Sequence, residues 1–550
     1  NLISVSVVKD SNKFDYYIYY KNNLIYEAKS FYNDDLELRI SFDDESNIDY
    51  IYPNLDEFER YGGSDEPEEN DLEEPLKEEE YLIDYDNNRT YYQILVYSFA
   101  DSNGDGIGDF KGIADNLDYL VSLGVEGLWL SPILQADSYH SYDINNYYKI
   151  NPKYCVTIDG TYYGINYLLK ECHKRNIKVL MDLVLNHTSY FHSWYYLYEA
   201  WYSADNRFGY PELDYDNPGV VSAVKEVGNY WLQRGFDGFR LDAAMWIYNS
   251  GENRHQKNVK FWQNWCSEMK KTKPDCYLIG EVLDDDHDLA YAYNNCGFDS
   301  TFDFNALGSV INATTNNNYD YAKVTSENNK KALDENPSFI MARCLSNHDI
   351  GRFNQAHPDS NDKAYYVEDI KEIKLANAIN ALTPGNTFIY YGDELGLMGT
   401  CEDTRPNYYY DMNYRTPMPF TNGLTDSESY FEAFHGSGIT TSKTYSNKTI
   451  EEDIADSNSI YNALKNALAL KNSSEVLQKG TIKEISDLPS GLSGFDVTYN
   501  NQTIRILYIS SNVTSSINYT IDGELLYNLG ASVNNKTITI STCNLIAFTI

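Results

Sequence analysis

The chain has 550 residues, and its 82 acidic against 43 basic side chains give a formal net charge of −39 at pH 7. This charge argues against a nucleic-acid partner, because phosphates would be repelled, whereas a neutral substrate or a cation is compatible with it. The absence of any run of about 18 apolar residues predicts no membrane-spanning helix, and the length suits an α/β barrel with appended modules.

Residues 1–85 are predicted to form a small β-rich module followed by an acidic linker. Short strand-like runs occur at 5–8, 16–20 and 36–42, and the acidic stretch covers 56–80. The alternative for this module is a carbohydrate-binding domain that uses some of its tyrosines. The first residue is Asn1, with neither an initiator Met nor an apolar leader, which suggests a processed chain.

Residues 86–474 alternate between strand-like and helix-like runs, as a closed parallel (β/α)8 TIM barrel requires. The predicted strands lie at 92–97, 125–130, 178–184, 237–241, 277–280, 300–304, 339–345 and 387–391. The predicted helices include 113–123, 163–175, 219–234, 256–271 and 454–470. Period-two alternation returns at 494–499, 504–509 and 537–550, so residues 475–550 are predicted to form a C-terminal antiparallel β-sandwich.

An acidic, glycine-rich loop, DSNGDGIGD at 101–109, follows the first predicted strand. Oxygen-bearing side chains on alternate residues suit a hard cation such as Ca²⁺, which accepts carboxylates, amides and carbonyls. An EF-hand would need Glu at the twelfth position, where this chain has Gly112. The loop therefore predicts one calcium ion in a site of another type, with a metal-free surface turn as the alternative.

Three of the strand-like runs end in a carboxylate, namely Asp242 in GFRLD, Glu281 in YLIGE and Asp349 in SNHD. In a parallel barrel the carboxyl ends of the strands converge on one mouth. Two carboxylates placed there can act as nucleophile and proton donor on a glycosidic bond, as retaining glycosidases need. Any one of them alone could instead belong to a structural ion pair.

Four motifs in the right order resemble the α-amylase family of glycoside hydrolases, also called family 13. They are DLVLNH at 182–187, GFRLDA at 238–243, GEV at 280–282 and NHD at 347–349. The resemblance runs from about residue 91 to 399 and continues through RTPM at 415–418. It implies a catalytic barrel of the oligo-1,6-glucosidase-like or bacterial α-amylase branch.

By this resemblance Asp242 is the nucleophile, Glu281 the acid/base and Asp349 a stabiliser of the transition state. Arg240, two residues before the nucleophile on the same strand face, can hold Asp242 ionised. Glu281 must carry a proton before the glycosidic bond breaks and therefore needs a raised pKa. For retention, the carboxyls of Asp242 and Glu281 are expected to lie about 5 to 5.5 Å apart.

The resemblance also implies residues that bind substrate. His187 and His348 are expected to bind sugar hydroxyls, and Tyr142 to provide a stacking platform for the terminal sugar. Asp143 and Arg415 are expected to pair and close the pocket beyond that sugar, which favours attack at chain ends. The alternative is that this pair only braces two loops.

In the same branch the first loop binds one structural calcium ion. The ligands expected here are Asp101, Asn103, Asp105, the Ile107 carbonyl and Asp109. Among the 52 tyrosines, those at 408–410 are predicted to line outer subsites. The eight cysteines are scattered without a CxxC pair, so neither a zinc site nor a disulfide scaffold is predicted.

The chain departs from the family pattern at two places. The insertion at 188–218 is a short form of the excursion called domain B. The nucleophile is followed by AAMW at 243–246, whereas many α-amylases have Lys-His at the last two positions. This removes a usual contact to the leaving-group sugars and a ligand of their central calcium. The small Ala243 favours α-1,4 over α-1,6 links, where the family has Val.

The sequence therefore predicts a secreted or cell-surface retaining hydrolase that cleaves α-1,4 bonds in maltooligosaccharides or starch. An α-glucosidase, an oligo-1,6-glucosidase or a glucanotransferase would use the same residues. A family member that binds carbohydrate without catalysis is the alternative of another class, and the presence of all three acids argues against it.

Overall fold

The computed structural model describes residues 3–10, 13–20, 23–31, 83–84, 86–204, 207–283, 291, 293–355, 366–403, 410–420 and 438–550. The chain divides into two compact units, Asn1–Glu68 and Glu69–Ile550, and each is described by itself. The strand predicted at 36–42, the acidic stretch at 56–80 and two of the predicted tyrosines, Tyr408 and Tyr409, lie outside the described residues, whereas Tyr410 begins a short 3-10 helix, Tyr410–Tyr414.

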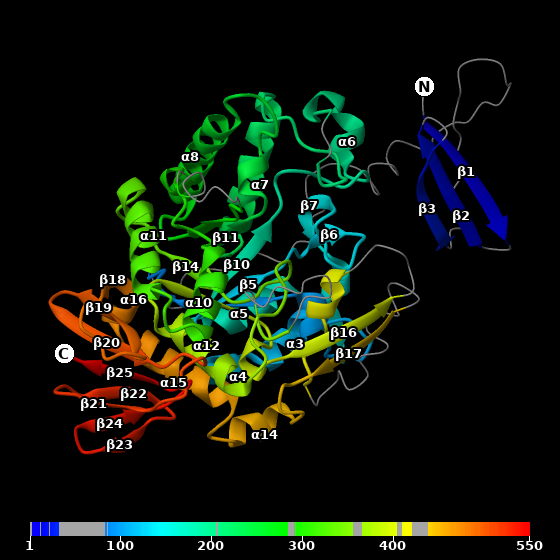
Figure 1. Ribbon diagram of the computed structural model, residues 1–550. Helices are drawn as coiled ribbons and strands as arrows, with labels where there is room; N and C mark the ends of the chain where they lie inside the picture. The colour runs from blue at the N-terminus through cyan, green and yellow to red at the C-terminus, as the bar shows by residue number, and fades with distance from the viewer. Residues whose placement is uncertain are drawn as a thin grey trace, which may run out of the picture. The chain divides into compact units, whose positions relative to one another are not determined.

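The first unit contains a three-stranded antiparallel sheet in the order β1-β2-β3 (Figure 1). Its strands are β1 (Ile3–Asp10), β2 (Lys13–Tyr20) and β3 (Asn23–Phe31). The strands predicted at 5–8 and 16–20 are confirmed. The third strand was not predicted, because its NLIYEAKSF sequence mixes charged and apolar residues without strict alternation.

Eight parallel strands form the centre of the second unit, in the order β13-β12-β11-β10-β5-β4-β15-β14. A parallel bridge between Phe302 and Ala342 joins the two ends of this order, so the sheet closes into the predicted barrel. The strands are β4 (Thr90–Ile94), β5 (Gly127–Leu130), β10 (Lys178–Leu183), β11 (Gly238–Leu241), β12 (Tyr277–Gly280), β13 (Ser300–Thr301), β14 (Ala342–Cys344) and β15 (Asn386–Tyr390). Aromatic rings fill the interior, where Tyr91 stacks between Tyr277 and Phe388 at centroid distances of 5.1 and 4.9 Å.

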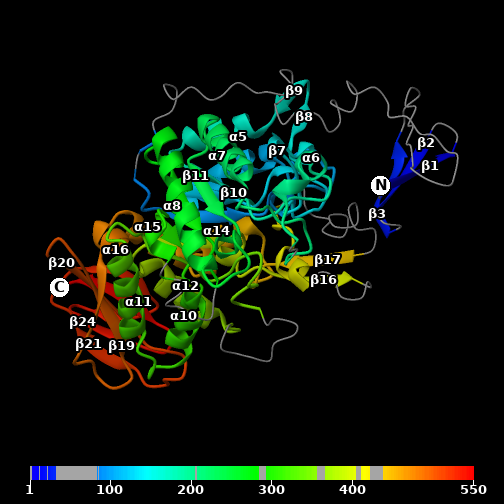
Figure 2. The same ribbon diagram turned by 90° about the horizontal axis from the view of Figure 1, so that it is seen from above.

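Helices surround these strands on the outside (Figures 1 and 2). They include α3 (Phe110–Asp115), α4 (Leu117–Leu123), α5 (Ile165–His173), α7 (Pro218–Gln233), α8 (Arg254–Thr272), α10 (Asn305–Thr315), α11 (Tyr321–Glu335), α12 (Ile370–Leu382), α14 (Ile450–Ala455), α15 (Ile460–Asn472) and α16 (Glu475–Lys479). The helix predicted at 113–123 is divided at Asn116, and the one predicted at 454–470 is divided before Ser459, whose side chain caps α15. None of the described helices has the length and apolar character needed to cross a bilayer.

Shorter elements lie in the connections. After β4 the chain forms α2 (Val96–Phe99), so the first predicted strand, 92–97, ends earlier than expected. Two hairpins follow β5, and the antiparallel pair β16 and β17 follows β15. The remaining pieces are β6 (Leu134–Ala136), β7 (Ile144–Ile150), β8 (Val156–Ile158), β9 (Thr161–Tyr163), α6 (Ser193–Leu197), β16 (Met398–Asp403) and β17 (Gly438–Lys443).

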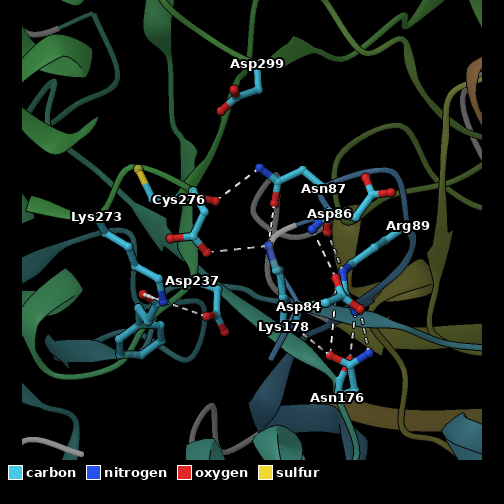
Figure 3. A network of polar contacts seen from close by, with 12 residues as sticks. Asp84, Asp86, Asn87, Arg89, Asn176, Lys178, Asp237, Lys273, Cys276 and Asp299 are labelled. Atoms are coloured by element: carbon cyan, nitrogen blue, oxygen red, sulfur yellow. Dashed lines mark hydrogen bonds and ion pairs between the residues drawn. The ribbon is translucent and has the colours of Figure 1, made fainter. Parts of the chain in front are cut away.

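Buried charges hold the amino-terminal edge of the barrel together (Figure 3). The fully buried Lys178 at the start of β10 donates to Asn87 Oδ1 at 2.7 Å, and burial lowers its pKa to about 8. Asp237, just before β11, accepts from Lys273 Nζ at 2.7 Å and contacts His173 Nε2 at 2.9 Å. These contacts join the starts of neighbouring strands, which is the edge of such a barrel that serves stability rather than chemistry.

The C-terminal part contains two antiparallel sheets. The larger has the order β18-β19-β20-β25-β22 and the smaller the order β21-β24-β23. Apolar side chains from both sheets share one cluster, as expected for the predicted β-sandwich. The strands are β18 (Thr481–Glu484), β19 (Ser493–Tyr499), β20 (Gln502–Tyr508), β21 (Ile517–Thr520), β22 (Leu525–Leu529), β23 (Ser532–Asn534), β24 (Thr537–Ile540) and β25 (Leu545–Thr549).

Candidate active site

The three predicted acids follow the carboxyl ends of barrel strands. Asp242 comes directly after β11, Glu281 directly after β12, and Asp349 lies beyond β14. Backbone bonds continue the strand pairing into two of them, since Asp242 N donates to Leu183 O at 3.2 Å and Glu281 N to Leu241 O at 2.9 Å. The barrel itself therefore fixes where these two side chains begin.

All three acids line one cavity of about 530 Å³. Its other polar walls come from side chains in three different connections, namely His140, Tyr142, His187 and Arg415. Its apolar and aromatic walls are Phe208, Tyr210, Ala243, Met245, Trp246 and Leu283. A mostly apolar cleft with a few convergent polar groups is the usual form of a site for a small ligand or a sugar.

Arg240 connects the carboxylates beneath this cavity. Its Nη1 lies 2.8 Å from Asp182 Oδ1 and 2.7 Å from Asp242 Oδ1, and its Nη2 lies 3.0 Å from Glu281 Oε2. The guanidinium is almost fully buried, at 2% side-chain exposure. One planar cation with a fixed fork of donors therefore orients the predicted nucleophile and the predicted acid/base at once.

Burial dominates the electrostatics of this cluster. It raises the pKa of Asp182 and raises that of Asp242 well above the ordinary value of 3.8. Arg240 lowers the pKa of Asp242, as predicted, but the nearby Glu281 and Asp182 act in the same direction as burial. Asp182 and Asp242 therefore keep a proton at a higher pH than isolated carboxyls would, and the two titrate together.

Asp349 has a different environment. Burial favours its neutral form, but His348 Nε2 at 3.0 Å and Arg415 Nη2 at 2.9 Å outweigh this and hold its pKa below the ordinary range. His348 is positioned in turn by Gln93 Nε2, 2.7 Å from its Nδ1. Asp349 is therefore a fixed negative charge at the cavity wall.

The turn after β11 has a strained backbone. Ala243 adopts φ 46° and ψ 40°, a left-handed conformation that costs a residue with a Cβ about 1 to 2 kcal/mol. In this conformation the Ala243 N–H donates to Glu281 Oε2 at 2.9 Å, and the Ala244 N–H donates to the Glu281 carbonyl at 3.0 Å. The strain therefore aims a backbone donor at the predicted acid/base.

Tyr142 and His187 form part of the cavity wall, as predicted. The Tyr142 ring stacks on His348 with a centroid distance of 5.4 Å, and its hydroxyl donates to Asp182 Oδ2 at 3.0 Å. The His187 ring stacks on Tyr210 at 5.0 Å. Burial lowers the pKa of His187 to about 4, so its imidazole is neutral at pH 7 and suited to bonds with hydroxyls.

Asp143 and Arg415 differ from the prediction, because no ion pair joins these two described residues. Asp143 is buried beside the cavity and accepts from the hydroxyl and the N–H of Ser138, the latter at 3.1 Å. Arg415 donates to Asp349, as above, and to the Tyr139 hydroxyl at 2.9 Å. Arg415 thus lines the site, while Asp143 shapes the loop that carries Tyr142.

Sequence reasoning gave no role to four residues that the structure places here: Asp182, Trp129, Gln93 and His140. Asp182 lies in register with Arg240 on neighbouring strands and is completely buried. The sequence signal for Asp182 is a charged residue among the apolar residues VLM and L of the strand KVLMDL. Such a residue needs a buried partner, and Arg240 on the next strand supplies it.

The predicted calcium loop has the oxygen-rich composition that a hard cation needs. Asp101 accepts from the N–H groups of Asn103, Gly104 and Gly106, while Asp105 accepts from the Ile107 N–H at 2.8 Å. These bonds fold the loop around its own carboxylates.

Asp109 is turned away from that group. It caps α3 through Gly112 N at 2.7 Å and also binds the Ser102 N–H and hydroxyl. In the described part of the chain, no three His, Cys, Asp or Glu side chains gather closely enough to hold a metal. Asp101, Asn103, Asp105 and the Ile107 carbonyl therefore fit a cation by their chemistry, whereas Asp109 would have to exchange bonds to join them.

Comparison with known families gives a match to the model described as "Alpha amylase, catalytic domain", over residues 93–207 and 195–480. These segments include the three acids of the cavity and most of the barrel.

Individual relatives agree with this match. The chain is 31% identical over 472 residues to alpha-amylase 3 of Dictyoglomus thermophilum, covering 78% of this chain and 86% of the relative. It is 29% identical over 372 residues to a 4-alpha-glucanotransferase of Thermotoga neapolitana, covering 61% and 76%. Among solved structures, Amy13B of Eubacterium rectale superposes with a TM-score of 0.70 at 26% identity, covering 85% of this chain and 96% of the other.

Proposed function

This chain belongs to the α-amylase family of glycoside hydrolases, and from that premise we propose that it cleaves α-1,4 bonds in maltooligosaccharides or starch fragments with retention. The observation that carries the proposal is the arrangement of Asp242, Glu281 and Asp349 around one cavity, with the first two bound to a single arginine. A pair of carboxyls held in this way can serve as nucleophile and as acid/base.

In the first step, Asp242 attacks the anomeric carbon and forms a glycosyl ester as the glycosidic bond breaks. Glu281 gives its proton to the departing oxygen, and Arg240 Nη2 and the Ala243 N–H hold its carboxyl in position. Asp349, ionised beside His348 and Arg415, faces the positive charge that develops on the sugar ring.

In the second step, Glu281 is a carboxylate and takes a proton from water. The resulting hydroxide attacks the same carbon and returns the electron pair to Asp242, so the product keeps the configuration of the substrate. The neutral His187 and the ring of Tyr142 hold the sugar at the cleavage point through hydroxyl bonds and face contact.

Preference for α-1,4 over α-1,6 links is supported by the small Ala243 beside the nucleophile. Transfer to a sugar acceptor instead of water is the second candidate, because a relative matched over 61% of this chain is a 4-alpha-glucanotransferase. Hydrolysis and transfer share the first step. They differ in whether water or a sugar hydroxyl attacks the glycosyl ester in the second step.

The test is a product profile on maltoheptaose and panose, with and without added glucose, followed by proton NMR of the newly formed anomers. We expect short α-configured products from maltoheptaose and, from panose, isomaltose rather than maltose, because only its α-1,4 bond should be cleaved. Initial products in the β configuration would contradict retention. Longer oligosaccharides that appear in early samples would assign the chain to transfer instead.

We also propose one structural calcium ion at the loop of Asp101, Asn103, Asp105 and Ile107, with Asp109 joining after it exchanges its present bonds. The support is the donor chemistry of the loop, which lies between α2 and α3 in the connection after β4. The ion would stabilise the loop and supply no chemistry to the cavity.

An extracellular or cell-surface location is proposed as well, because a starch polymer must meet the enzyme outside a membrane; cell fractionation tests it.

A further inference from the structure

Arg352 is a buried arginine in the connection after β14, three residues beyond Asp349. Its Nη1 donates to the Tyr391 carbonyl at 2.8 Å and lies 3.4 Å from Asp393 Oδ1. Both acceptors belong to the segment that follows β15. Within the described residues, Nε and Nη2 of this arginine are buried without a partner, so the fold leaves two of its donor groups unused.

The pair of Arg352 and Asp393 is poorly suited to stabilising the fold. Burial raises the pKa of Asp393 to about 7, although the charge of Arg352 lowers it, so the ionised form of this carboxyl is disfavoured here. A buried ion pair is often no better for stability than two apolar side chains of similar volume. The position of the pair in the fold indicates another role.

The connection that carries Asp349 is closed at its base. The Phe353 N–H donates to Ser346 Oγ at 2.9 Å, and the Ser346 hydroxyl forms a hydrogen bond with the Asp393 carboxyl. Asp393 therefore contacts both ends of this connection, Ser346 directly and Arg352 through the ion pair.

The segment after β15 also holds the part of the chain that carries Arg415. The Tyr390 hydroxyl donates to the Tyr414 carbonyl at 2.9 Å, and the Tyr391 hydroxyl donates to the Thr416 carbonyl at 2.9 Å. Two neighbouring tyrosines thus fix the carbonyls on either side of Arg415.

Arg352 contacts the rings of both tyrosines. Its Cζ lies 4.8 Å from the ring centroid of Tyr390 and 5.1 Å from that of Tyr391, both at cation–π distance. The same guanidinium therefore supports the residues that hold Arg415 and the connection that carries Asp349. These two residues form the 2.9 Å ion pair at the cavity wall.

Resting on the proposed function, we infer that Arg352 and Asp393 are positioning residues for catalysis. They hold Asp349 and Arg415 where the Asp349 carboxylate faces the positive charge that develops on the sugar ring. Both positioning residues are buried and neither is among the residues that line the cavity, so they act through the ion pair and not on the substrate. A displacement of about 1 Å in a catalytic group is enough to lower a rate up to about a hundredfold.

The main test replaces both positioning residues by apolar side chains of similar total volume, in the double variant Arg352→Met with Asp393→Val. Its midpoint of urea unfolding should stay close to that of the wild type. Its kcat on maltoheptaose should fall about tenfold to a hundredfold, with KM within about threefold, because the weakened interaction forms in the transition state. Asp393→Asn keeps the shape of the site and should lower kcat about threefold or more, which decides the matter if the double variant does not fold.

A second comparison tests whether the effect passes through Asp349. In an enzyme that already carries Asp349→Asn, the double replacement should lower kcat on α-maltosyl fluoride by less than about twofold, because the charge to be positioned is absent. With Asp349 in place, the loss on the same substrate should again be about tenfold or more.

Arg343→Met is the matched control. Arg343 is a buried arginine of β14, and its Nε lies 4.0 Å from Asp303 Oδ2. It donates to the Pro384 carbonyl, which precedes β15 at the opposite edge of the barrel. This variant should lose stability, with kcat unchanged for the folded fraction.

An unchanged kcat in the folded double variant would overturn the inference. So would a loss confined to KM, or an equal loss with and without the Asp349→Asn exchange. A wild type that hydrolyses neither maltoheptaose nor α-maltosyl fluoride would count against the proposed function instead, so the two failures are distinguishable.

Discussion

Two buried aspartates at opposite ends of the same strand have pKa shifts of opposite sign. Asp237 precedes β11 at the amino-terminal edge, and Asp242 follows it at the cavity. Burial opposes ionisation of both. At Asp237 the charges of Lys273 and His173 outweigh burial and lower its pKa, whereas at Asp242 burial prevails and raises it. One acid therefore stabilises the fold, and the other is held ready for chemistry at a cost in stability.

These opposite shifts give opposite mutant phenotypes. Asp237→Ala should lower the free energy of unfolding by about 3 to 5 kcal/mol, because it leaves the half-buried Lys273 and the buried His173 without their partner, with kcat unchanged for the folded fraction. Asp242→Asn should lower kcat at least about 10³-fold and leave stability equal or up to about 2 kcal/mol higher. Urea unfolding and turnover of maltoheptaose measure both. A stable Asp237→Ala or an active Asp242→Asn would contradict the assignment.

The pH dependence of stability follows the same signs. Since the folded-state pKa of Asp237 is lowered, its contribution is present above the unfolded value and is lost as the pH falls. Since that of Asp242 is raised, the folded state binds the proton more tightly, and stability declines as the pH rises through the raised value. Replacing each residue should remove its own part of the pH–stability curve.

Asp182→Asn tests the shared cluster through the pH profile of kcat/KM. The nucleophile must be ionised, so activity falls on the acidic side where Asp242 takes up a proton. The charge of Asp182 raises the pKa of Asp242, and its removal also frees an Arg240 donor. The acidic limb should therefore move to lower pH. A limb that stays in place or moves upward would show that Asp182 does not couple to the nucleophile.

In the turn after β11, the strained backbone of Ala243 positions an N–H group against Glu281 in the site. Ala243→Gly should relieve the left-handed conformation, keep the N–H bond to Glu281 and leave the melting temperature equal or slightly higher. Ala243→Val places a β-branched residue at φ 46° and should cost about 2 kcal/mol or more, with reduced kcat. Calorimetry with turnover numbers checks both. A fully stable and active Val variant would mean that the turn tolerates another conformation.

The calcium loop is the element whose behaviour depends on a partner ion. If it binds Ca²⁺, a chelator should lower the melting temperature by several degrees and excess Ca²⁺ should restore it, since a ligand of the folded state stabilises by mass action. Asp105→Asn should have the lower melting temperature already, and the chelator should not change it further. Asp522→Asn, which changes an exposed acid between β21 and β22, is the control and should respond like the wild type. A wild type indifferent to chelator contradicts the site.

For the whole molecule, the barrel could be predicted because its strands are short apolar runs with helices between them, and because acids such as Asp242 and Glu281 mark their ends. The first and last residues of helices and strands were harder to predict, because local signals such as the Ser459 cap decide where a helix divides. Two features depend on how distant loops pack. They are the pairing of Arg415 with Asp349 instead of Asp143, and the position of the arginines beside Trp246. Sequence spacing carries no information on such packing.

The most direct measurement uses a fluorinated glucosyl or maltosyl fluoride that slows the second step, given to the wild type and to Glu281→Gln, with mass spectrometry of the digested protein. We expect the peptide that contains Asp242 to gain the mass of one fluorinated glucosyl or maltosyl group, according to the reagent, attached through that side chain. A sugar on another residue, or no adduct while the fluoride is consumed, would contradict a mechanism in which Asp242 and Glu281 share one sugar.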